Sequence, residues 1–259
     1  MVTSKLALPE TEVSLEGLSV RPYRDVIAYP VPDDLNVKSR IDQLDNLGVE
    51  RIRFAGEASV NGLSVLGKGC VGIVVEGQLK DETRVALKIR RTDANRPSMI
   101  GEAQLHRRAN AEDVGPSLLG ESADVLSMRL VRGSTLPAWT SSLSGRDERV
   151  ISILRELLEQ CFTLDRIGLD HGELSHAHKN VLITSDYPVI IDFESASLKR
   201  KPSNVTSIIQ YLFIAGTISH IVRGITGCGN EKSLIESLTT YKRTMTRVAF
   251  ENVLSVLGL

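Results

Sequence analysis

The chain has 259 residues, 42% of them hydrophobic, which is enough for one sizeable core or for two lobes. Its 31 basic and 32 acidic residues give a formal net charge of −1, and only 4% of the residues are aromatic. These figures argue against a general polyanion-binding protein and against a platform on which nucleic-acid bases stack, although local basic patches remain open. The three cysteines, Cys70, Cys161 and Cys228, form no CxxC pair, so we expect no disulfide framework and no cysteine zinc site.

The N-terminus and the hydropathy pattern indicate no export or membrane segment. The first 18 residues lack the apolar core of a signal peptide, and the chain has no run of 18 apolar residues. We therefore expect a soluble protein of the cytoplasm that makes no contact with a membrane.

The first half of the chain predicts a sheet with two helices. Runs of β-branched residues separated by glycines and polar turns are typical of antiparallel strands joined by short connections. The first predicted helix has Asp34 as its N-cap, and Gly48 ends it. The predicted elements are strands over 52–60, 62–91 and 122–136 and helices over 34–47 and 97–115.

After Arg146 the pattern becomes mainly helical. Apolar residues recur at helical spacing from Val150 to Cys161, and Gly168 ends this helix. The predicted elements are helices over 146–168, 204–222 and 233–259 and a short buried strand at the start of 188–195. The Ser- and Gly-containing stretch 133–145 is the predicted boundary between the sheet-rich half and the helical half.

A glycine-rich stretch, LGKGCVGIVVEG, contains Gly67, Gly69 and Gly72 in the pattern GxGxxG. A dinucleotide-binding fingerprint needs a helix after the glycines, but here the chain continues as a strand. The stretch therefore predicts a hairpin that can fold over phosphates, because glycine lacks the Cβ atom that keeps a backbone away. An ordinary glycine-rich hairpin explains the stretch equally well when it is taken alone.

A lysine lies in the middle of the predicted strand VALKIRR. Lys88 is flanked by apolar residues, and an ammonium group in such a place needs a partner because an unpaired buried charge is costly. Glu102, on the next predicted helix, is the candidate partner. The alternative is a lysine on the open face of the sheet.

An acid ends the apolar strand VIIDFES. Asp192 stands where the chain leaves the core, and Asn180 precedes it by twelve residues. Carboxylate and amide oxygens are ligands that Mg²⁺ accepts. The alternative is an acid that only caps a turn.

Together these stretches resemble the signature motifs of protein kinases. Residues 67–74 (GKGCVGIV) match GxGxxGxV, residues 85–88 (VALK) match VAIK, and Glu102 matches the helix glutamate that pairs with the lysine. HGEL at 171–174 is similar to HRDL, Asn180 to the catalytic-loop asparagine, and DFE at 192–194 to DFG. The chain after Asp192 is short and has no APE motif, a layout similar to RIO-type kinases, the KEOPS kinase subunit and short atypical Ser/Thr kinases of archaea.

The resemblance implies an α+β, bilobal protein kinase-like fold with an antiparallel sheet N-lobe over 61–133 and a compact helical C-lobe over 134–259. Residues 1–60 are then an extension that packs on the N-lobe. It also implies an ATP-dependent phosphotransferase that uses Mg²⁺ or Mn²⁺ and acts on Ser or Thr of a protein substrate, with autophosphorylation as an option. Binding of nucleic acid is left open.

The resemblance also assigns roles to residues. Lys88, held by Glu102, binds the ATP phosphates; Glu173 is the catalytic base; Asn180 and Asp192 bind the metal ion. The residues implied in ATP binding are Gly67, Lys68, Gly69, Cys70, Val71, Gly72, Val74, Ala86, Lys88, Met128 and Leu130.

Three departures from the kinase pattern stand out. The base position holds Glu173 instead of aspartate, Asn180 follows it by seven residues where the family has five, and Glu194 replaces the glycine of DFG. The glutamate at the base position and the altered spacing motivate one alternative, a nucleotide-binding pseudokinase that acts as a scaffold. A RIO-like ATPase in ribosome or tRNA assembly and a small-molecule kinase are the others.

Two further features allow competing interpretations. His171, His176 and His178 lie close together in sequence, as metal ligands can, but the HExxH pattern of a helical zinc site is absent. The resemblance to kinases implies instead that His171 packs beneath the loop and bonds backbone. The basic stretch 197–204 (SLKRKPSN) is expected to be a solvated loop, with contact to an acidic peptide or RNA as the alternative.

Overall fold

The computed structural model describes residues 10–259 and shows a mixed α+β protein with an antiparallel sheet and helices. The chain divides into two compact units. The first, here called the sheet unit, comprises 10–107 and Ser117–Leu130. The second, the helical unit, comprises Arg108–Pro116 and Val131–Leu259.

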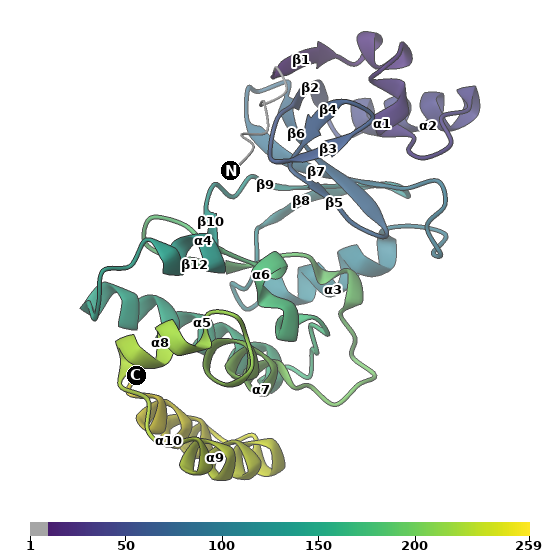
Figure 1. Cartoon of the computed structure of the whole chain (residues 1–259). Helices are drawn as coiled ribbons and strands as arrows, with labels where there is room; N and C mark the ends of the chain where they lie inside the picture. The colour runs from purple at the N-terminus through teal and green to yellow at the C-terminus, as the bar shows by residue number, and fades with distance from the viewer. Residues whose placement is uncertain (1–9) are drawn as a thin grey trace. The chain divides into compact units, whose positions relative to one another are not determined.

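The sheet unit is built on a seven-stranded antiparallel sheet (Figure 1). The strands run in the order β1-β2-β6-β7-β9-β8, and β5 pairs with β6. Their bounds are β1 Thr11–Ser14, β2 Val49–Phe54, β5 Gly67–Lys68, β6 Gly72–Leu79, β7 Arg84–Arg90, β8 Leu118–Glu121 and β9 Val125–Arg129. A separate small hairpin pairs β3 (Ala58–Val60) with β4 (Leu63–Val65).

The two faces of this sheet have different partners because side chains alternate along each strand. On one face, buried residues such as Ile73 and Leu87 pack against Val37 and Leu44 of helix α2 (Asp34–Asn46). The other face contributes to a smaller cluster with helix α3, which spans Ile100–Asn110. A short helix α1 (Arg24–Ile27) and a 3-10 turn η1 (Glu16–Ser19) complete the unit.

Helix α2 begins one residue earlier than the sequence indicated. The side chain of Asp33, not Asp34, is the N-cap, because its Oδ1 accepts a hydrogen bond from the backbone N–H of Asn36 at 2.8 Å. Gly48, with φ +75°, follows the end of the helix as predicted.

The segment before residue 60 is joined to the rest of the sheet unit by strand pairing and by a buried ion pair. Strand β2 pairs with β6. Arg40 of α2 is almost fully buried and bonds the carboxylate of Asp124, which also accepts from Arg90 Nε at 2.5 Å. Desolvation opposes the charge of Asp124, but bonds from Gln43 and Arg90 together with the charge of Arg40 hold the pKa of this carboxyl below its usual value.

The helical unit is organised around helix α5, Glu148–Arg166. The predicted apolar stripe of this helix is buried, and Gly168 with φ +76° follows its end. The other helices are α4 Leu136–Ser141, α6 Ala177–Asn180, α7 Asn204–Ile209, α8 Ser219–Thr226, α9 Glu231–Thr244 and α10 Arg247–Leu257. The remaining elements are strands β10 Ser134–Thr135, β11 Val181–Ile183 and β12 Pro188–Ile190, 3-10 turns η2 Leu174–His176 and η3 Phe193–Ser195, and π-turn η4 Gln210–Ile214.

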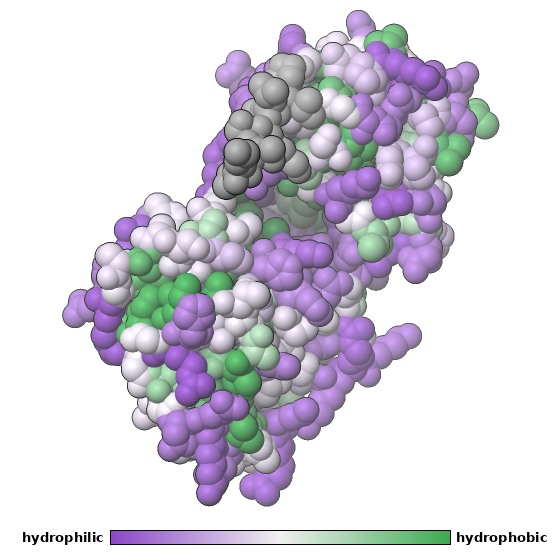
Figure 2. All heavy atoms as spheres, in the orientation of Figure 1, coloured by the Kyte–Doolittle hydropathy of each residue, from purple (hydrophilic) through white to green (hydrophobic). Residues whose placement is uncertain are grey.

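The outer surface is mostly hydrophilic on the face drawn in Figure 2, where apolar residues gather in small groups on the helical unit. Within the described part of the chain, no single helix is both long and apolar enough to cross a membrane. The helix Asn204–Ile214 together with α8 meets the length and composition required only as a pair bent by 91°.

Candidate functional site

The glycine-rich stretch forms a hairpin between β5 and β6. Gly67 pairs with Val74, and the backbone N–H of Gly69 donates to the carbonyl of Gly72 at 2.8 Å, which closes the turn. Lys68, Gly69 and Cys70 are exposed at its tip. The backbone of this tip is therefore accessible to a ligand, as the phosphate-binding interpretation requires.

The third glycine makes room for the strand lysine. A Cβ atom on Gly72 would lie 3.1 Å from Cγ and 3.3 Å from Cε of Lys88, closer than ordinary side-chain contacts. The side chain of Lys88 therefore packs directly against the backbone of Gly72. The predicted glycine and lysine motifs come together in one place.

Lys88 and Glu102 form the expected ion pair. Nζ of Lys88 donates to Oε1 of Glu102 at 2.8 Å, and the two side chains are only 5% and 2% exposed. Arg96 contacts the other oxygen of Glu102 at 3.3 Å. The buried carboxylate of Glu102 therefore has two cationic partners, and it fixes the lysine against the sheet.

An apolar strip borders this lysine on the same face of the sheet. Val74 is opposite Lys88 in the register of β6 and β7, and Ala86 is opposite Met128 in the register of β7 and β9. All three apolar residues are half-buried, as is Leu130 just beyond β9. Val71, by contrast, is buried in the cluster with α3.

A tyrosine from the N-terminal segment holds the tip of the hairpin. Nζ of Lys68 donates to the hydroxyl of Tyr29 at 3.0 Å and lies 4.5 Å from its ring centroid. The guanidinium of Arg91 lies 5.1 Å from the same ring and donates to the carbonyl of Gly69 at 3.1 Å. The sequence interpretation missed Tyr29 and Arg91, since neither belongs to a recognisable motif.

In the helical unit, His171 is a buried residue of the loop that carries the candidate base. Its ring is fully buried, its Nε2 bonds the carbonyl of Ile191 at 3.0 Å, and its backbone N–H donates to Oδ1 of Asn204 at 2.8 Å. Burial lowers the pKa of His171, so the ring is neutral at pH 7 and Nε2 is the donor. The expected backbone-bonding role of His171 is confirmed.

A buried aspartate on α5 fixes this loop from below. Asp165 accepts from the backbone and side-chain nitrogens of Asn204, both at 2.8 Å, and from the hydroxyl of Tyr241 at 2.8 Å. Asn204 in turn donates to the carbonyl of Leu169 at 2.7 Å. Burial raises the pKa of Asp165, and its hydrogen bonds oppose that shift.

The candidate base, Glu173, is held at both oxygens. Oε1 accepts from the hydroxyl of Ser195 at 2.5 Å, and Oε2 accepts from Nδ2 of Asn180 at 3.4 Å. Nδ2 of Asn180 also donates to the carbonyl of Glu173 at 3.2 Å, so the seven-residue spacing closes into a compact loop.

The candidate metal ligands lie at one end of the β11–β12 hairpin. Asn180 directly precedes β11, Asp192 follows β12, and the N–H of Ile191 donates to the carbonyl of Asn180 at 2.9 Å. Asp192 has φ +68°, whereas Glu194 lies in the turn η3 and has no positive φ. The glycine of the DFG pattern is therefore not needed at position 194 of this chain.

The neighbouring Asp170 has its own structural partners. It is buried, accepts from Nε of Arg200 at 2.7 Å and accepts from the backbone N–H of Ser203 at 3.2 Å. The basic stretch 197–204 is therefore more than a solvated loop, because Arg200 and Asn204 both hold the loop of Glu173. Sequence reasoning missed these roles.

The histidines do not form a metal site of the usual kind. The rings of His176 and His178 meet edge to face at 6.3 Å, while His171 faces Phe193. Across residues 10–259, no group of three or more His, Cys, Asp or Glu residues is arranged to hold a metal ion.

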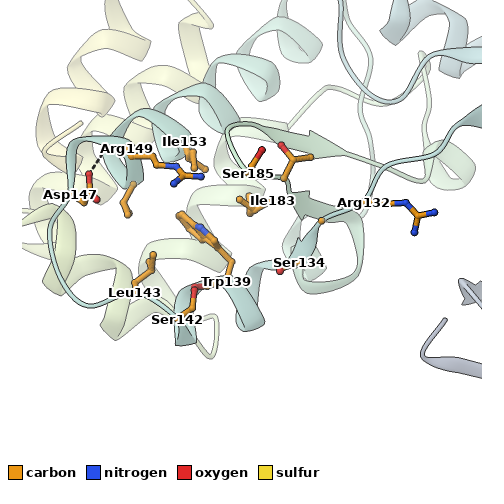
Figure 3. Close-up of a pocket in the computed structure, with 13 residues that line it drawn as sticks. Arg132, Ser134, Trp139, Ser142, Leu143, Asp147, Arg149, Ile153, Ile183 and Ser185 are labelled. Atoms are coloured by element: carbon orange, nitrogen blue, oxygen red, sulfur yellow. Dashed lines mark hydrogen bonds between the residues drawn. The ribbon is translucent and has the colours of Figure 1, made fainter. Parts of the chain in front are cut away.

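The helical unit also has an open hollow of about 400 Å³ beside Trp139. Figure 3 shows the indole pointing toward Arg149 and Ile153 of α5, and Arg132 pointing away. None of the predicted site residues lines it, and its charges are already paired in part, since Arg149 lies 3.5 Å from Asp186. It is a surface feature separate from the groups described above.

Comparison with known proteins gives little further information. No protein-family model matches the chain. The chain is similar to a protein of Methanocaldococcus jannaschii whose name states only that it is uncharacterized: the two are 29% identical over 96 residues, which are 37% of this chain and 80% of that protein. The site residues of this chain are therefore the basis for any functional conclusion.

Proposed function

We propose that this protein is an ATP- and Mg²⁺-dependent phosphotransferase, an atypical Ser/Thr protein kinase with a bilobal kinase-like fold. The observation that carries the proposal is the buried Lys88–Glu102 pair beneath a glycine hairpin. Buried lysines are uncommon because desolvating the ammonium group is costly, so a buried and paired lysine points to a functional role. Because Glu102 holds Lys88 against the sheet, the ammonium group has a fixed position, as binding of ATP phosphates requires.

The helical unit supports the same proposal with the second group of residues. Glu173 accepts a hydrogen bond from the hydroxyl of the acceptor and takes its proton as the new P–O bond forms. The hairpin backbone, Lys68 and Lys88 bind phosphate oxygens, and Val74, Ala86 and Met128 contact the base.

The residues of the β11–β12 hairpin fit a magnesium ion. Asn180 and Asp192 supply one amide oxygen and one carboxylate, the oxygen donors that Mg²⁺ prefers. When bound, the ion would neutralise charge on the phosphate oxygens. Mn²⁺ accepts the same ligands.

A phosphate-transfer assay with the full chain and labelled ATP tests the proposal. Protein, small hydroxyl compounds and water are offered as acceptors, so that a protein kinase, a small-molecule kinase and an ATPase give different products. Binding of Mg-ATP at 100 times its Kd should stabilise the fold by about 2.7 kcal/mol and raise its Tm. Binding without any transfer would instead support the scaffold.

Lys88→Met is the decisive variant for this assay. Arg96 still contacts Glu102 in the variant, so the carboxylate keeps a cationic partner and the fold should persist. Transfer should fall by at least 100-fold, a loss of about 2.7 kcal/mol of transition-state stabilisation. Lys38→Met, on the exposed face of α2, is the matched control and should leave transfer unchanged. Equal transfer by Lys88→Met would remove Lys88 from the site.

A further inference from the structure

Ser195 contacts the candidate base from a segment that the kinase motifs do not include. It ends the turn η3, and its hydroxyl donates to Oε1 of Glu173 at 2.5 Å. Asn180 donates to Oε2 of the same carboxylate from the other side. Both oxygens of Glu173 are therefore held by donors from two different segments.

A glutamate needs more restraint than an aspartate in the same place. Its extra methylene adds a rotatable bond, and ordering such a side chain costs conformational entropy. A base must lie within hydrogen-bond reach of the acceptor hydroxyl, and small displacements reduce the rate strongly. Two donors fixed in position supply that restraint.

The serine is itself fixed by the surrounding loop. Nη2 of Arg200 donates to the carbonyl of Ser195 at 2.5 Å, while Nε of Arg200 donates to Asp170 at 2.7 Å. Asp170 is buried, so this arginine is tied to the core of the unit.

The local backbone is shaped for the same contact. Gly172 has φ +87°, a conformation that favours glycine. A Cβ atom there would lie 2.7 Å from the carbonyl oxygen of Ser195 and 2.5 Å from Nη2 of Arg200. A glycine at 172 therefore lets Ser195 and Arg200 approach the loop of Glu173.

We infer that Ser195 is a positioning residue: its hydroxyl, together with Asn180, fixes the carboxylate of Glu173 where the acceptor hydroxyl must meet it. This inference rests on the proposed function. It also explains how a glutamate serves at a position where the kinase pattern has aspartate. Ser195 then positions Glu173 and is not itself the acceptor of phosphate.

The test compares Ser195→Ala, Ser195→Thr and the control Ser197→Ala in the full chain. Ser197 lies in the same segment, and its hydroxyl oxygen only accepts from the N–H of Lys199. We expect Ser195→Ala to lower kcat about tenfold, at the scale of one lost hydrogen bond to a charged group, with the KM for ATP unchanged. Ser195→Thr, which keeps the hydroxyl, should restore most of kcat, and Ser197→Ala should match the wild type.

Three outcomes would overturn the inference. Unchanged kcat in Ser195→Ala, with an active wild type, removes Ser195 from the site and leaves the proposed function standing. Phosphate found on Ser195 by mass spectrometry after incubation with Mg-ATP makes it an acceptor instead. Wild-type protein that transfers no phosphate and shows no Tm increase with Mg-ATP contradicts the proposed function, and the inference falls with it.

Discussion

His171 shows how one buried residue couples stability to pH. Its pKa is lowered in the folded state, chiefly by burial, relative to about 6.5 in an unfolded chain. The unfolded chain therefore binds the proton more tightly, and the free energy of unfolding falls as pH drops below about 6.5. The stability contributed by the neutral ring is present above that pH and is lost below it.

The prediction is a smaller pH dependence in His171→Gln, which keeps an N–H donor but does not titrate. Urea unfolding at pH 7.5 and 5.5 should show that the wild type loses more stability than the variant. The slope of the difference is at most about 1.4 kcal/mol per pH unit, the limit for one proton. Taking the difference between the wild type and His171→Gln cancels the contribution of other titrating groups. Asp165 is one of them, and its raised pKa makes the fold more stable as pH falls, opposite to the effect of His171. Equal losses in both proteins would show that His171 does not titrate on unfolding.

The site residues differ in how far sequence alone could predict them. Gly72, Lys88 and Glu102 follow one another in a pattern with fixed spacing, and the structure brings them into contact. Ser195 and Arg200 carry no such pattern. Their contacts with the loop of Glu173 arise only when separate loops pack together, so no local signal indicates them.

Among the elements, the glycine hairpin depends on a residue from outside the predicted site. Tyr29 holds Lys68 by a hydrogen bond and by its ring face, and Arg91 extends the contact to Gly69. A cation over an aromatic ring contributes about 0.5–1 kcal/mol at exposed sites. The hairpin is thus partly ordered before any ligand binds.

Tyr29→Ala should therefore weaken ATP binding. Without the ring, the hairpin must be ordered by the nucleotide itself, and that cost reduces affinity. We expect the KM for ATP to rise about threefold to tenfold, matching the loss of roughly 1 kcal/mol, with kcat little changed. Tyr29→Phe keeps the ring but loses the hydroxyl, so its KM for ATP should lie between those of the wild type and Tyr29→Ala. A KM for ATP that stays at the wild-type value in Tyr29→Ala would contradict this role.

Elements were predicted where their hydrophobic pattern was long and regular. Strands β6 and β7 lie within the predicted strand region, and the apolar stripe predicted for helix α5 is buried. Strands β1 and β8 were missed because each is a four-residue edge strand without a fully buried residue. Helix α4 was taken as a connector, since six residues beginning Leu-Pro are too short to show a helical period.

At the scale of the whole molecule, the predicted residues fall into two groups in two units. The glycine hairpin, Lys88 and Glu102 belong to the sheet unit, and Glu173, Asn180 and Asp192 belong to the helical unit. Each group is ordered by its own buried contacts. The proposed phosphotransferase needs both groups, because one binds the nucleotide phosphates and the other activates the acceptor.

The most direct test of that proposal is phosphate transfer by Glu173→Gln, measured beside its affinity for Mg-ATP. The amide keeps the size of the side chain and can still accept from Ser195, but it cannot take a proton. Positioned general bases contribute roughly 10²–10⁴-fold, and the lower end applies to a loose phosphoryl-transfer transition state. The account predicts a kcat about 100-fold lower with an unchanged Kd for Mg-ATP, while Glu148→Gln, at the exposed start of α5, matches the wild type. Transfer by Glu173→Gln at the wild-type rate would contradict it.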